Sequence, residues 1–582
     1  MKPQSWTVES MRRALLLASV FVAGSATAQE LDHRELAADE QVVHALSRLT
    51  FGARPGDAAR VRAIGLDKWV AQQLQPDRIP DANSESVIRG FTVLGQDPND
   101  MLREFAEAQR ERRVARRSAD SAATMIPARG AANSRRRLVT TLQSARVARA
   151  LTTERQLQEV ITDFWLNHFN VFAQKGPPQP FYLPEYEAAV RARSLGKFRD
   201  LLGAVAKSPA MLFYLDNARS MGDTTNPRLA VVTGRRRRRL PDDMRQNVDR
   251  LRSGGLNENY ARELLELHTL GVDGGYTQQD VIEVARALTG WTIRQPAEGG
   301  GFVFRPVMHD AASKQVLGVV LRDGRGIEDG EQVLDIVARH PSTARHIARK
   351  LVTRLVSDQP PQALVDRAAE VFRRTDGDIR EVVRAIVTSN EFYTRSAYRS
   401  KVKSPFEVVV SALRAVNAAP DHTPRTAQAI AYVGQPIYGH QPPNGYPETG
   451  DSWMNAGAIL NRINFGIAIA AGRIPGVTLD ALPGFDSLRS AERAKQVDGV
   501  VAMLLGGAIS SETREILISG ENPLLGRATE APSFELDDTA ETSGMQASPG
   551  APPRRRNRQI PQLHGLAQVV GLALGSPEFQ RR

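Results

Sequence analysis

Apolar residues recur at helical rather than strand spacing along most of the chain, and this periodicity constrains the fold more than any other feature. The stretch from Leu157 to His168 places its apolar side chains three and four residues apart, as one buried face of a helix requires. Val-rich alternating runs are scarce, and the best strand candidate is Phe302 to Leu321, where a small hairpin is expected among glycines. We therefore expect a mostly α fold, a multi-helix bundle or orthogonal helical array with at most a small β-hairpin.

Three segments carry sequence signals for the start of a helix. Thr153-Glu154-Arg155-Gln156 and Ser404-Pro405-Phe406-Glu407 have the form of a capping box, in which the first and fourth side chains bond each other's backbone N–H groups. Asp378 is expected to cap a helix that runs from Ile379 to Val387. These signals support the helical assignment independently of the apolar periodicity.

Composition divides the chain into six regions. Residues 530–558 mix Pro, Gly, Ser, Thr and charge, and such a segment buries too little apolar surface to offset the entropy lost on ordering. The expected regions are a signal peptide (1–28), an N-terminal helical region (29–110), an Arg-rich and partly disordered segment (111–150), a main helical body (151–529), a disordered linker (530–558) and a C-terminal helix that packs back on the body (559–582).

The first 28 residues are typical of an export signal. Positive charges at Lys2, Arg12 and Arg13 precede the apolar stretch Ala14 to Ala23, which is too short to span a bilayer, and Ala26-Thr27-Ala28 supplies small residues for cleavage. The chain contains no cysteine, which excludes thiolate metal sites and cysteine nucleophiles and fits an oxidising compartment. We expect an exported protein, periplasmic or secreted, and both the general and the twin-arginine export routes remain open.

The formal net charge is +11, from 76 Lys and Arg against 65 Asp and Glu. Much of the excess lies in three runs, Arg110 to Arg117, Arg235 to Arg239 and Arg554 to Arg556. Such runs are usually solvated and mobile, and the alternative is contact with an anionic polysaccharide or lipid surface. No aromatic residues interleave with the runs to stack on bases, so no nucleic acid is expected as a partner.

The densest group of polar residues lies at the start of a predicted helical hairpin. Helical spacing places Asn259, Glu263 and Glu266 on one face and His268 on another, apolar face. Three interpretations remain open: a salt-bridged solvated face with a core histidine, a polar ligand site, or a divalent metal site with oxygen and imidazole ligands. Neither a Glu-x-x-His pair nor a His-Glu-x-x-His motif supports the metal site. The candidate residues are Asn257, Glu258, Asn259, Arg262, Glu263, Glu266 and His268.

His168 is a further candidate, although a histidine on the apolar face of a helix is more often a hydrogen-bonded core residue than a ligand. His309-Asp310 would form an acid–base pair only if two adjacent loop residues pointed the same way. The Pro- and Gly-rich stretch Gly434 to Pro447 would either line a pocket or close the helical bundle, and Asp451-Ser452 is expected to cap a helix from Trp453 to Ala471. The weaker candidates are Asp280, His309, Asp310, Gln435, Asn444 and Trp453.

Together these segments resemble the bacterial proteins filed as Domain of Unknown Function 1800. The resemblance implies a mostly helical, exported protein and supplies no catalytic residue. Genes of this family often lie beside those of a second exported family, Domain of Unknown Function 1501, and the association implies an exported sulfatase-like partner. The matching segments are His44 to Gly52, Gly65 to Trp69, Phe164 to Phe169, Asn257 to Trp291, His309-Asp310, Gly434 to Trp453 and Ser576 to Phe579.

Two classes of function remain open. The first is a non-enzymatic module that binds or matures another exported protein. The second is a metal-dependent or other hydrolase in the periplasm or at the cell surface, built on His168, Glu263, Glu266 and His268 with a divalent metal as cofactor. The chain has no Gly-x-Ser-x-Gly elbow, P-loop or dinucleotide-binding motif, whereas a Ser-His-Asp triad needs no local spacing and remains open.

Overall fold

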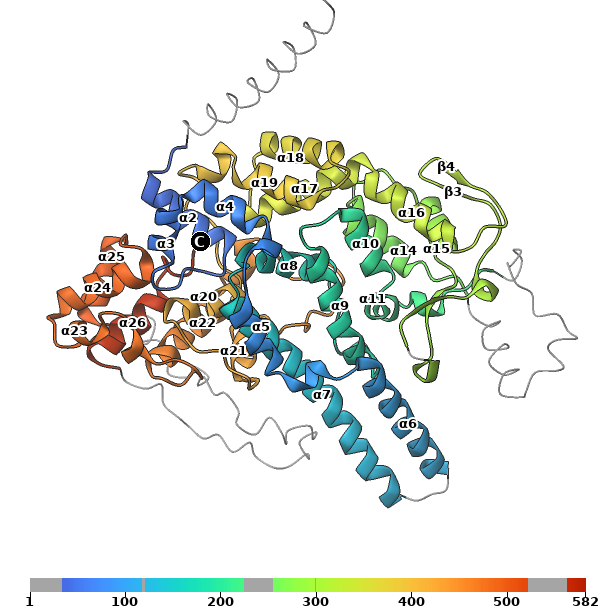
Figure 1. The fold of residues 1–582 in the computed structure, drawn as a ribbon, viewed down its shortest axis with the longest axis horizontal. Coiled ribbons are helices and arrows are strands. Elements are labelled where there is room, and N and C mark those ends of the chain that lie inside the picture. The colour runs from blue at the N-terminus through green and yellow to red at the C-terminus, as the bar shows by residue number, and fades with distance from the viewer. Residues whose placement is uncertain (1–33, 118–120, 224–254, 299, 522–562) are drawn as a thin grey trace, which may run out of the picture.

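The computed structural model describes residues 34–117, 121–223, 255–298, 300–521 and 563–582, and helices dominate them (Figure 1). The predicted signal peptide, the linker 530–558 and the runs Arg235 to Arg239 and Arg554 to Arg556 lie outside these residues. Within the described ranges, no helix is both long and apolar enough to cross a bilayer. The fold is mostly α, as the periodicity predicts.

The N-terminal third combines four short helices with a long helical hairpin that projects from the body (Figure 1). The Arg-rich segment 111–150, for which partial disorder is predicted, falls in the two hairpin helices except for 118–120, which lie outside the described residues. Ala and Arg are strong helix formers, and the base of the hairpin is anchored by buried Leu138, Leu142 and Leu151. The helices are α2 (Ala38–Leu49), α3 (Asp57–Ile64), α4 (Leu66–Gln73), α5 (Ala82–Arg89), α6 (Pro98–Arg117) and α7 (Ser121–Thr152).

The middle of the chain forms the central helical layers. Asp378 caps α19 as predicted, because its carboxylate accepts the Glu381 N–H. The capping box at Thr153 is wrong: the Thr153 hydroxyl donates to Asp81, and α8 begins without a side-chain cap. The helices are α8 (Gln156–His168), α9 (Gln179–Arg193), α10 (Phe198–Ala206), α11 (Pro209–Tyr214), α14 (Asn259–Glu263), the π-helical turn η5 (Leu264–Thr269), α15 (Gln278–Ala287), α16 (Ile327–Arg339), α17 (Pro341–Leu355), α18 (Gln362–Arg374) and α19 (Ile379–Val387).

Two antiparallel strand pairs take the place of the single predicted hairpin. β3 (Lys314–Val316) and β4 (Val319–Leu321) form a hairpin inside the predicted segment, whereas β2 (Phe302–Phe304) pairs with the earlier strand β1 (Trp291–Ile293). The reason is the Trp291 indole, which is fully buried against the Phe302 ring. Among the residues that the structure describes, neither pair extends into a larger sheet.

The last third packs beside the N-terminal helices, as Figure 1 shows. The capping box at Ser404 and Glu407 is confirmed. The predicted cap at Asp451-Ser452 is wrong, since these residues lie in the short turn η9 (Gly450–Trp453) and Asn455 caps the helix. The helices are α20 (Pro405–Ala415), α21 (Arg425–Val433), α22 (Ala456–Ala470), α23 (Phe485–Arg489), α24 (Arg493–Leu505), α25 (Ser511–Ser519) and α26 (Gly565–Gly575).

Candidate functional site

The tryptophan–histidine helix and the carboxylate-rich hairpin meet in a buried cluster of histidines. His168 ends α8, and its Nε2 lies 3.1 Å from the backbone carbonyl oxygen of His268 in η5. The two imidazole centroids are 6.3 Å apart, and the ring of His346 from α17 lies 6.2 Å from that of His168. His346 carries no motif, so only the fold reveals that it joins the cluster.

Burial lowers the pKa of all three histidines, to about 3 for His268 and about 4 for His346, and the nearby ammonium group of Lys350 lowers each further. The imidazoles are therefore neutral at pH 7. Across the part of the chain that the structure describes, no group of three or more His, Asp or Glu side chains is placed to hold a metal ion. The cluster has the character of a histidine core.

The predicted carboxylates point away from this core. Glu258 pairs with Arg262 at 3.3 Å, and both side chains are partly exposed, at 37% and 40%. Burial and the neighbouring Glu266 raise the pKa of Glu263, while Glu266 accepts the Tyr276 hydroxyl at 3.4 Å. The hairpin therefore does not bring its carboxylates and its histidine to one site.

The remaining polar residues of the hairpin hold the backbone in place. The side-chain amides of Asn257 and Asn259 donate to the carbonyl oxygens of Asp216 and Leu215. Asp280 completes the capping box of α15 and also accepts the Leu317 N–H at 2.7 Å. These contacts favour the structural interpretation of the hairpin over a ligand site.

His309 and Asp310 do not form the predicted acid–base pair, because their side chains point to different partners. His309 donates from Nδ1 to the Thr289 carbonyl oxygen, and its Nε2 lies 3.4 Å from Asp329. The Asp310 carboxylate binds the Arg286 guanidinium at 2.9 Å. Both His309 and Asp310 are fully buried, so the pairs hold the β-strand region together.

A buried network of charges joins α8, α17 and α20 at the centre of the molecule. Arg354 lies 3.0 Å from Asp163, 3.0 Å from Glu407 and 3.2 Å from Glu448. Arg582 approaches Glu407 at 3.1 Å. Burial alone would raise the pKa of Glu407, but the guanidinium groups of Arg354 and Arg582 lower it to about 2. The carboxylate is thus held ionised in the interior.

The Pro- and Gly-rich loop closes over this network. The Asn167 side chain donates to the Tyr446 carbonyl oxygen and accepts the Tyr446 N–H, and Asn170 donates to His440 and Pro442. The two cavities beneath the loop measure about 10 and 30 Å³, which is room for about one water molecule. This geometry favours the interpretation that the loop closes the bundle.

Three further candidate residues form hydrogen bonds that involve the same loop. Gln435 accepts the Phe406 N–H, Asn444 lies 3.1 Å from the His440 ring nitrogen, and the Trp453 indole N–H donates to Pro447. The Gln435 and Trp453 contacts are part-buried, whereas the Asn444 contact lies on the exposed side of the loop.

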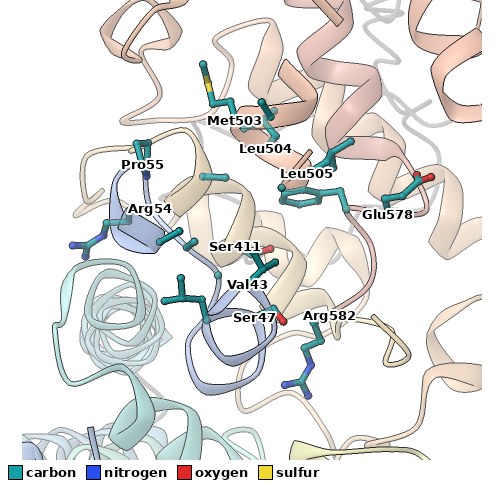
Figure 2. A pocket seen from close by; sticks show the side chains of 18 of the residues that line it. Val43, Ser47, Arg54, Pro55, Ser411, Met503, Leu504, Leu505, Glu578 and Arg582 are labelled. Carbon is teal, nitrogen blue, oxygen red and sulfur yellow. The ribbon is translucent and has the colours of Figure 1, made fainter. Parts of the chain in front are cut away.

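A much larger cavity, about 550 Å³, separates the N-terminal helices from the C-terminal helices (Figure 2). Figure 2 shows Val43 and Ser47 of α2 on one wall and Met503 and Leu505 of α24 on the opposite wall, with Ser411 of α20 between them. We call it the α2–α24 pocket. Most of its lining is apolar, and its charged lining residues are Arg54, Arg399, Lys403, Glu578, Arg581 and Arg582.

The floor of the α2–α24 pocket carries an amine and a hydroxyl in contact. Lys403 Nζ lies 3.0 Å from Ser411 Oγ and 3.9 Å from the centroid of the Phe579 ring. Burial lowers the pKa of Lys403 to about 7. Gly52, at a φ of +102°, crosses directly over Ser411, where an added Cβ would lie 2.8 Å from the Ser411 Cβ.

No sequence signal points to this pair. Lys403 and Ser411 are eight residues apart, a spacing that matches no catalytic motif, and Phe579 lies far beyond both in the sequence.

A second cavity, about 540 Å³, lies between α7 and the loop, where Arg135 and Pro436 are among its lining residues.

The protein belongs to the family described as "Protein of unknown function (DUF1800)", whose model matches residues 44–581. The match confirms the resemblance, and the matched residues include every lining residue of the α2–α24 pocket except Val43 and Arg582. No curated protein and no solved structure matches the chain. The family description assigns no activity.

Proposed function

We propose that the protein acts outside the cytoplasm and binds a segment of another exported protein in the α2–α24 pocket. The observation that carries the proposal is the pocket itself, whose volume and mostly apolar lining are those of ligand sites. The signal-like N-terminus supports export. The family resemblance suggests a sulfatase-like protein of the Domain of Unknown Function 1501 family as the partner.

The charges of the lining indicate what the bound segment carries. The lining contains five cationic residues and one carboxylate, Glu578, which is engaged by the Ser510 N–H and the Thr513 hydroxyl. Arg54 and Arg582 are paired with Glu154 and Glu407, which leaves Arg399, Arg581 and Lys403 as the cationic residues that face no carboxylate of the lining. The Arg399 guanidinium donates hydrogen bonds to the carbonyl oxygens of Leu505 and Ala508. Because these carbonyls carry no net charge, they leave the positive charge of Arg399 uncompensated. An apolar segment with acidic side chains is therefore the complementary ligand.

Filling the pocket tests the proposal. Ala502 is an exposed residue of the lining, and Ala502→Trp would occupy the cavity, whereas Ala363→Trp places the same ring on an exposed face of α18. We expect an exported protein to co-purify from the native host with the wild type and with A363W, and its recovery to fall at least about tenfold with A502W. Equal recovery with both variants, or a wild-type protein that emerges alone under mild conditions, would contradict the proposal.

A further inference from the structure

Building on that binding function, we propose that the α2–α24 pocket is also a catalytic site for acyl groups. Ser411 attacks the carbonyl carbon of an ester or amide in the bound segment, and Lys403 is the general base that takes the hydroxyl proton. The protein is then a hydrolase whose nucleophile and base are Ser411 and Lys403, and the histidine cluster does not contribute.

The geometry of the pair supports this role. In the structure Lys403 Nζ donates to Ser411 Oγ at 3.0 Å, and the Ser411 hydroxyl donates to the Val408 carbonyl oxygen at 3.2 Å. Once the amine has lost its proton, rotation of the hydroxyl hydrogen toward Nζ allows direct proton transfer over that 3.0 Å. Both residues are more than nine-tenths buried, at 8% and 3% exposed, and both line the 550 Å³ pocket. The Phe579 ring packs against the Lys403 amine, and the close passage of Gly52 confines Ser411. A nucleophile and a base are thus preorganised at the floor of a binding cavity.

The surroundings of Lys403 give its amine the protonation state that a base needs. Burial is the main cause of its low pKa, about 7; Glu407 opposes the shift, and Arg582 and Arg462 add to it. The neutral amine is therefore far more populated at pH 7 than in an ordinary lysine, of which fewer than about one in a thousand would be neutral. A neutral amine accepts the Ser411 proton, as in other activated hydroxyl nucleophiles.

The reaction balances without a metal or a redox partner. The Ser411 Oγ–carbon bond forms as the hydroxyl proton moves to Lys403 Nζ, and the leaving alcohol or amine takes that proton as its bond to the carbonyl carbon breaks. Water then attacks the acyl-serine, gives one proton to Lys403, and the acid leaves as that proton returns to Ser411 Oγ. The guanidinium groups of Arg399 and Arg582 act electrostatically on Lys403 at the floor of the pocket, and the positive potential they add there favours the negative charge that develops on the carbonyl oxygen.

Activated esters test the chemistry independently of any partner protein. The full chain is mixed with p-nitrophenyl acetate and hexanoate, and released p-nitrophenol is followed while peptide mass mapping locates the acyl group. We expect a burst of about one p-nitrophenol per chain, an ester on Ser411, and a rate that rises with pH through about 7. Ser411→Ala and Lys403→Arg should lower the burst rate at least about 100-fold. Ser490→Ala, which removes an exposed hydroxyl outside the pocket, should leave it unchanged.

Every other outcome decides against the dyad. No burst in the wild type, an unchanged burst in Ser411→Ala, or acyl groups found as amides on Lys403 would overturn it. Circular dichroism of Ser411→Ala and Lys403→Arg guards against loss of folding. Ser411→Cys adds a second readout: because the natural chain has no cysteine, its one thiol should take the acyl group from the ester at this position. Co-purification of a partner with the wild type and with Ser411→Ala tests the two proposals separately. A wild-type protein that binds a partner but gives no burst would contradict only the catalytic proposal.

Discussion

Replacing Glu407 with glutamine removes one charge from the buried network and keeps the shape of the side chain. Glu407 is 4% exposed, and its Oε1 contacts Arg354 at 3.0 Å and Arg582 at 3.1 Å. The amide oxygen of a glutamine still accepts the Ser404 N–H at the start of α20. What the variant loses is therefore the electrostatic attraction between a buried carboxylate and two buried guanidinium groups.

The magnitude follows from the pKa of Glu407. Its drop from 4.5 to about 2 corresponds to a contribution of about 3 kcal/mol to the free energy of unfolding. Loss of one partner from a buried ion pair typically costs about 3–5 kcal/mol, which agrees. Because the folded-state pKa is lowered, the stabilisation is complete above about pH 4.5 and is lost as the pH falls toward 2. The difference between wild type and variant should shrink to roughly half by pH 3.

Urea denaturation followed by circular dichroism measures this loss at pH 7 and pH 3. Glu381→Gln is the matched control, because Glu381 pairs with Arg384 at 3.1 Å on an exposed face of α19, where an ion pair contributes under about 1 kcal/mol. A loss below about 1 kcal/mol for Glu407→Gln at pH 7, or a loss that is the same at pH 3, would refute the reasoning.

Three further outcomes are expected. Gly445→Ala should destabilise the protein by at least about 2 kcal/mol more than Gly434→Ala, as judged by urea denaturation, since both have positive φ but only at Gly445 would a Cβ lie 2.2 Å from the Asn167 carbonyl oxygen. Lys403 has a lowered folded-state pKa, so the unfolded chain binds more protons between pH 7 and 10.5; wild-type stability should rise by up to about 4 kcal/mol over that window relative to Lys403→Met, and parallel curves would be inconsistent with a buried amine. The three arginine runs predict binding to an anionic polymer that weakens between low and high salt, and binding unaffected by salt would reject their role.

Local chemistry made parts of the fold predictable from the sequence. The caps at Asp378 and Ser404 rest on residues close in the chain, and the apolar face that buries His168 and His268 follows from helical spacing. The cap expected at Thr153 failed because the hydroxyl finds a distant partner, Asp81, which no local pattern indicates. Local signals are thus reliable only where tertiary contacts do not compete for the same atoms.

The candidate site could not be predicted from the sequence, because it too depends on contacts between residues that are distant in the chain. Lys403, Ser411 and Phe579 come together only because the end of the chain pairs with residues 401–403, where the Lys403 N–H donates to the Gln580 carbonyl oxygen. The unusual pKa of Lys403 is a product of that burial and leaves no trace in the order of residues. The density of polar residues instead indicates the Asn257 to His268 hairpin, where the charged side chains are partly exposed and Glu258 pairs with Arg262.

Site-specific photo-crosslinking in the native host tests the binding claim most directly. A benzophenone amino acid at Met503, on the wall of the α2–α24 pocket, is compared with the same group at Val272, which is 68% exposed elsewhere on the surface. The position 503 probe should yield one product, with an exported protein joined through an apolar segment that carries acidic residues. The absence of any product at 503, or the same products from both positions, would contradict the account.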